Sequence, residues 1–165
     1  MTLVAAFALA QNGGDPHITA ATHGKGVALS QDGRKAEFGF EAQKFVNRKG
    51  AEEVRGNFNF AQVANNAGPH VKIHAPKIGR LGTQDKTAEF AGPAVLVVRK
   101  DGTAREFKGR IVVAVADLKE QKAEGDKADH IKVSFKADKS DMTFEFGGAV
   151  TRGDIVVRTK PAGNN

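Results

Sequence analysis

The chain of 165 residues has no cysteine, no tryptophan and no tyrosine, whereas it has 11 phenylalanines. The absence of cysteine excludes a disulfide framework, a zinc–thiolate site and a cysteine nucleophile, so a hydrophobic core has to stabilise the fold. Tryptophan and tyrosine are the residues that most often stack on sugars and bases, so their absence argues against a sugar-stacking site. Hydrophobic residues make up 40% of the chain, which is ordinary for one globular domain and too many for a disordered chain.

The charged residues give a net charge of +6, from 25 Lys and Arg against 19 Asp and Glu. They are interleaved along the chain, and no basic run exceeds two residues. This pattern is typical of a solvated surface rather than a nucleic-acid footprint. An anionic polymer or an anionic cell surface remains open as a partner.

The N-terminal segment, residues 1–10, reads MTLVAAFALA. Leu3 to Leu9 resembles the apolar region of a signal peptide, and Ala8-Leu9-Ala10 fits a small-x-small cleavage site, although no basic region precedes them. We interpret the segment as a signal-peptide remnant, which predicts a secreted or periplasmic protein; the alternative is a first core element. No stretch approaches the ~20 apolar residues needed to span a membrane as a helix.

The remaining chain predicts one β domain. The expected organisation is a flexible lead-in or first strand over residues 11–22, a single β domain over 23–160 and a tail over 161–165.

The most strongly patterned stretch is Ala88 to Asp117. Two apolar runs, Ala94–Val98 and Ile111–Ala116, flank a Lys-Asp-Gly-Thr turn, which is the strongest short-range signal for a β-hairpin. Both runs are apolar at successive positions, so both faces of the hairpin should be covered. One face should meet the core, and the other a loop, the N-terminal segment or a second subunit. The 88–117 hairpin is therefore a candidate for self-association.

Elsewhere apolar and polar residues alternate over short runs that Gly, Asp and Asn turns separate. About eight to ten strands are expected, in an antiparallel β-barrel or sandwich. Within them, Gly92-Pro93 predicts a bulge, Gly147-Gly148 a bulge or bend, and Arg152-Gly153-Asp154 a turn before a last strand.

Short glycine and phenylalanine motifs recur in a characteristic order. They are Gly24–Val27, Ala36–Phe40, Arg55–Phe60, Ala88–Gly92, Val115–Asp117, Gly125-Asp126, Ile131, Val133, Gly148 and Gly153–Val157. In this order the chain resembles the post-COAP-1 domain, a secreted all-β module of extracellular bacterial proteins. The resemblance implies a β-rich module without known catalytic residues.

The segment between the hairpin and the next strand is the main candidate for a metal site. Asp117, Glu124, Asp126 and Asp129 supply the hard oxygen ligands that suit calcium. The spacing is not that of an EF-hand, and interspersed lysines neutralise much of the charge, which favours a solvated loop.

The sequence contains no nucleophile elbow, P-loop or dinucleotide fingerprint, so we expect a non-enzymatic module with a structural or interaction role at the cell exterior. The alternative is a barrel that binds a small apolar ligand in an interior lined by Phe38, Phe58 and Phe144. A weaker third hypothesis is a hydrolase that uses Glu37 and Glu41 as a carboxylate pair.

Overall fold

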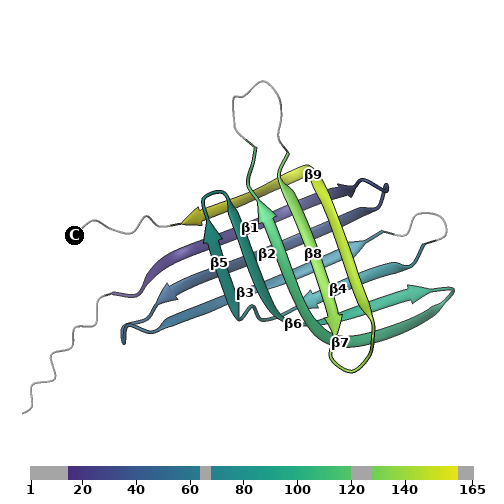
Figure 1. Cartoon of the computed structure of the whole chain (residues 1–165), viewed down its shortest axis with the longest axis horizontal. Coiled ribbons are helices and arrows are strands. Elements are labelled where there is room, and N and C mark those ends of the chain that lie inside the picture. Colours follow the sequence, from purple (N-terminus) through teal and green to yellow (C-terminus); the bar gives the residue numbers. More distant parts are fainter. Residues whose placement is uncertain (1–14, 64–67, 120–127, 160–165) are drawn as a thin grey trace, which may run out of the picture.

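A computed structural model of the chain describes residues 15–63, 68–119 and 128–159, and shows nine β-strands (Figure 1). The strands are β1 (His17–Ser30), β2 (Lys35–Val46), β3 (Glu52–Gln62), β4 (His70–Ala75), β5 (Arg80–Gln84), β6 (Thr87–Lys100), β7 (Thr103–Ala116), β8 (His130–Ala137) and β9 (Thr143–Thr159). The first strand begins at His17, inside the stretch for which a lead-in or a strand was expected. Among the described residues there is no helix, and hence none long and apolar enough to cross a membrane.

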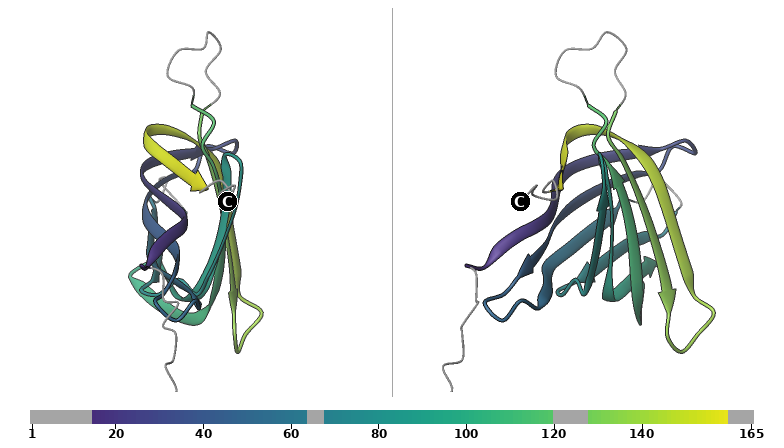
Figure 2. Two further views of the ribbon diagram at one scale, coloured as in Figure 1. Left: turned by 90° about the vertical axis from the view of Figure 1, so that its left-hand side faces the viewer. Right: turned by 60° about the vertical axis from the view of Figure 1, so that its left-hand side comes forward.

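The strands form a closed antiparallel barrel, which confirms the all-β prediction and decides between barrel and sandwich. Their order is β4-β3-β2-β1-β9-β8-β7-β6, and pairing of β4 with β6 closes the barrel. The short strand β5 is added to the first half of β6. Seen from the side, the barrel is flattened, with β1, β2 and β3 in one layer and β5, β7 and β8 in the facing layer (Figure 2).

The predicted hairpin is confirmed as β6 and β7. Its turn residues Asp101 and Gly102 have φ angles of 51° and 76°, the left-handed pair that a two-residue hairpin turn requires. The bulge predicted at Gly92-Pro93 is wrong, because both residues stay in an unbroken register with β7. At Pro93, β6 passes from its pairing with β5 to its pairing with β4. Pro93 has no strand partner on this side, so its missing N–H costs no hydrogen bond there.

The turn predicted at Arg152-Gly153-Asp154 is also wrong, because β9 is one long bent strand. Its first part pairs with β8 and its last part with β1, and both partners pair at Gly148 and Ala149. Gly153, at φ 100°, lies against Gly26, and a β-carbon on either glycine would overlap a backbone carbonyl oxygen of the other strand. Two glycines thus let β9 bend without leaving the sheet.

Phenylalanine rings fill the space between the two layers. Phe90 is fully buried, with its ring centre 5.0 Å from that of Phe40 and 5.9 Å from that of Phe58. Phe60 and Phe146 meet edge to face at 5.2 Å. Burying each such ring contributes about 1.5–3 kcal/mol to folding. Together with the buried Ile, Leu and Val side chains, this cluster stabilises a chain that has no disulfides.

Candidate interaction surfaces

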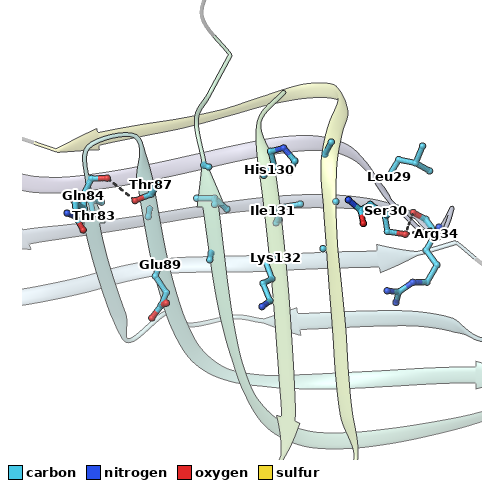
Figure 3. A pocket seen from close by; sticks show the side chains of 18 of the residues that line it. Leu29, Ser30, Arg34, Thr83, Gln84, Thr87, Glu89, His130, Ile131 and Lys132 are labelled. Atoms are coloured by element: carbon cyan, nitrogen blue, oxygen red, sulfur yellow. Dashed lines mark hydrogen bonds between the residues drawn. The ribbon is translucent and has the colours of Figure 1, made fainter. Parts of the chain in front are cut away.

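An open groove of about 1100 Å³ runs across the outer face of β5 to β9 (Figure 3). The strand register places two rows of outward side chains along it. The rows are Gly82–Glu89–Ala114–Lys132–Gly147 and Gln84–Thr87–Ala116–His130–Ala149–Leu29. Alanine and glycine form the floor, while the longer polar side chains rise on both sides. We call this feature the outer groove.

The turn between β1 and β2 forms one end of the outer groove. The Arg34 guanidinium donates hydrogen bonds to the Glu145 carbonyl oxygen at 3.0 Å and to Gln62 Oε1 at 3.3 Å, so it ties this turn to β9 and β3. The Ser30 hydroxyl donates to Asp32, and together with the adjacent Arg34 it holds the pKa of the Asp32 carboxyl below its ordinary value. This end of the outer groove therefore presents one cationic and one anionic side chain, Arg34 and Asp32, both held by hydrogen bonds.

The outer face of β7 is open to solvent from Val112 to Ala116, whereas Ala91, the neighbour of Val112 on β6, is only 4% exposed. Val112 is 38% exposed, and its neighbours Ala114 and Ala116 on β7 are half-buried. The sequence predicted a cover for this face, and the described part of the chain leaves it uncovered.

Two of the predicted calcium ligands bind backbone amides. Asp129 is only 2% exposed, and its carboxylate accepts N–H bonds from Leu118 at 2.9 Å, Lys119 at 3.0 Å and Ile155 at 2.9 Å. The carboxylate of Asp117 accepts one from Val157 at 3.2 Å. In the last part of β9, Ile155 and Val157 pair with β1 on one side only, so the two aspartates replace a missing neighbouring strand.

The other two predicted ligands, Glu124 and Asp126, lie outside the described residues. Within the described ranges, no group of three or more His, Asp or Glu side chains is placed to hold a metal ion. The sequence did not predict that Asp129 binds backbone amides, because an acidic residue in a charged segment is typical of a solvated loop. The position of Asp129 directly before a strand was the only sequence feature that indicated a bond to the backbone.

The three phenylalanines predicted to line an interior site lie in the core. Phe38 and Phe58 are 4% and 0% exposed, and Phe144 is partly buried with its ring 5.8 Å from that of Phe60. None of the three lines the outer groove or the smaller hollow described next.

A second hollow of about 570 Å³ lies on the outer face of β9, β1, β2 and β3, over Gly39. Its polar rim comprises His23, Lys25, Glu41, Asn57, Asn59 and Asp154. Asn57 donates to Glu41 at 3.1 Å, and His74 Nδ1 lies 2.6 Å from Asn59 Oδ1. Glu37 does not line this hollow, so the structure does not bring the two predicted hydrolase carboxylates to one cleft here.

Four exposed cations form what we call the basic face, on the outer side of β4, β7 and β8: Lys72, Lys108, Arg110 and Lys136. Arg110 and Lys136 are direct partners across β7 and β8. One carboxylate lies within the face: Glu106 is two residues before Lys108 on β7 and shares a row with Lys72, because both pair with Val97. Among the described residues, no carboxylate oxygen lies within 4.0 Å of any of the four cationic groups. The sequence did not reveal this face, because its members come from three separate strands.

Comparison with protein families, curated proteins and solved structures found no match to this chain. The resemblance to the post-COAP-1 domain stays a prediction. The fold and the surfaces define an eight-stranded antiparallel barrel with one additional strand, whose two described hollows both lie on its outer side.

Proposed function

We propose that the protein is a secreted, non-enzymatic β-barrel module that binds an anionic polymer of the cell exterior through its basic face. The observation that carries this proposal is the pair Arg110–Lys136. These two cations are directly opposite each other across two strands, and no described carboxylate pairs with either.

Like charges at directly opposite positions of a sheet destabilise it by about a few tenths of a kcal/mol or more. An anionic group that binds between Arg110 and Lys136 would remove this repulsion and gain two charge-assisted hydrogen bonds. The repulsion is therefore a cost to the free protein that a bound anion would relieve.

The arrangement of the cations supports a polymer rather than a single small anion. Lys108 and Arg110 are two residues apart on one strand, hence about 7 Å apart, and Lys72 lies beyond β6 on β4. A chain of anionic groups can contact all of them, whereas one small ion cannot. Secretion, which the signal-like N-terminal segment favours, would place this face among anionic polysaccharides.

The test is binding to a sulfated or carboxylated polysaccharide, measured by calorimetry at several salt concentrations. The double variant Arg110→Glu with Lys136→Glu should bind at least tenfold more weakly, and binding by the natural protein should weaken as salt rises. The matched control is Lys25→Glu with Arg158→Glu, two exposed positions on β1 and the last part of β9, outside the strands of the basic face. It has the same net charge as the first double variant and should lose only the affinity that comes from long-range attraction.

Equal losses in the two double variants would contradict a site at the basic face. Tighter binding to duplex DNA than to the polysaccharide would overturn the choice of partner. Binding of a fluorescent fatty acid that neither variant weakens would favour the alternative function, a small ligand inside the barrel.

A further inference from the structure

The outer face of β5 to β9 carries opposite charges at mirrored positions on either side of β7. In the row through Ala114, the neighbour on β6 is Glu89 and the neighbour on β8 is Lys132. Both side chains are exposed. Glu89 pairs with Arg80 at 3.0 Å, whereas Lys132 has no carboxylate within 4.0 Å in the described chain.

The adjacent row repeats this pattern. It runs Arg80–Ala91–Val112–Ser134–Glu145, so a cation and an anion occupy its two ends and small residues flank the centre. Glu145 is exposed, and its carboxylate has no ion-pair partner among the described residues. In both rows, reflection about β7 exchanges a positive residue for a negative one.

This relation is what a two-fold symmetric contact requires, because residue i of one copy then meets residue j of the other and the reverse. We propose that a second copy of this chain packs on this face, with the two-fold axis parallel to β7. Glu89 of each copy then meets Lys132 of its partner, and Arg80 of each copy meets Glu145 of its partner.

Along the axis, the small apolar side chains of β7 meet their own counterparts. Val112, Ala114 and Ala116 are half-buried or exposed in the single chain and become covered in the pair. The floor of small residues in the outer groove lets the two sheets approach closely, while the charged pairs close the sides. The cover that the hairpin needs is thus a second subunit.

The size of this face sets the expected strength. Five strands about 4.8 Å apart and three rows about 7 Å apart cover about 24 Å by 21 Å, or roughly 500 Å² per copy. A total of about 1000 Å² lies at the low end for specific contacts, so we expect weak dimerisation, with dissociation constants between about 10 μM and 1 mM. Arg110, in the next row on β7, would face its own copy across the axis, so it bounds the contact and keeps the basic face outside it.

The test is sedimentation velocity from about 10 μM to 1 mM. The natural protein should shift from monomer to dimer over this range. Glu89→Lys and Lys132→Glu should each weaken dimerisation at least tenfold, because each variant places like charges against each other. An equimolar mixture of the two variants should restore dimerisation. Positions 89 and 132 are both cationic in the first variant and both anionic in the second, so each 89–132 contact in a mixed dimer joins opposite charges.

Two further variants bracket the result. Ala114→Arg, at the centre of the face, should abolish the dimer, and Glu37→Lys on the outer side of β2 should leave it unchanged. A protein that stays monomeric at about 1 mM overturns the proposal, as does a dimer that Ala114→Arg does not affect. A mixture of the two charge variants that remains monomeric excludes the proposed axis.

Discussion

Replacing Asp129 should test how the barrel closes at the bend of β9. In Asp129→Ala, the amide of Ile155, which is fully buried, loses its acceptor, and an unsatisfied buried amide costs about 1–3 kcal/mol. The amides of Leu118 and Lys119 are only partly buried and can bind water, so each loses about 0.5–1.5 kcal/mol. The sum is about 2–6 kcal/mol, a large share of the 5–15 kcal/mol typical of a domain.

Urea denaturation, followed by far-ultraviolet circular dichroism, measures this loss as a change in the free energy of unfolding. Asp129→Asn should recover only part of the loss, because its amide NH₂ would face a backbone N–H. Asp117→Ala removes one hydrogen bond and should cost about 0.5–1.5 kcal/mol. Asp154→Ala, at an exposed position of β9, is the control and should change the free energy of unfolding by no more than about 0.5 kcal/mol. A loss below about 1 kcal/mol for Asp129→Ala would refute the reasoning.

Three further predictions follow from the described residues. Gly26→Ala should lower the free energy of unfolding by about 1–3 kcal/mol, because the new β-carbon overlaps a backbone carbonyl. Gly39→Ala has open space around the new β-carbon and should change the free energy of unfolding little. Equal effects of the two variants in urea denaturation would contradict the steric reason. In an NMR titration, Asp32 should have a pKa below its ordinary value, because the Ser30 hydroxyl and the Arg34 guanidinium favour its charged form. The charged carboxylate therefore stabilises the fold above pH ~3.8, and this contribution is lost as the pH falls through the lowered pKa. Arg34→Leu should raise that pKa, and an unchanged value would exclude the ion pair as a cause. Calcium should leave the melting temperature unchanged, because the buried aspartate before β8 already binds three amides; a rise that a chelator reverses would restore the predicted calcium site.

Local patterns in the sequence predicted the elements that depend on neighbouring residues. The Asp101-Gly102 turn and the inward positions of Phe38 and Phe58 follow from turn chemistry and two-residue alternation. The bend of β9 was predicted to be a turn because glycine is typical both of turns and of bent strands. Only the contact of Gly153 with Gly26 on a distant strand distinguishes the two structures.

The candidate surfaces depend on which strands are neighbours, and the sequence does not contain that information locally. Lys108, Arg110 and Lys136 look like ordinary surface cations until β7 and β8 are paired in register. The mirrored charges Glu89 and Lys132 likewise become a pattern only when β6, β7 and β8 lie side by side. Long-range register, rather than residue type, therefore defines both proposed interfaces.

The most direct test of the proposed function is a map of amide chemical shifts during titration with a sulfated oligosaccharide. We predict that the largest changes fall on Lys72, Lys108, Arg110 and Lys136 and their strand neighbours, and that they disappear at high salt. Changes centred on the interior, for example at Phe58, or no saturable changes at all, would contradict binding at the basic face.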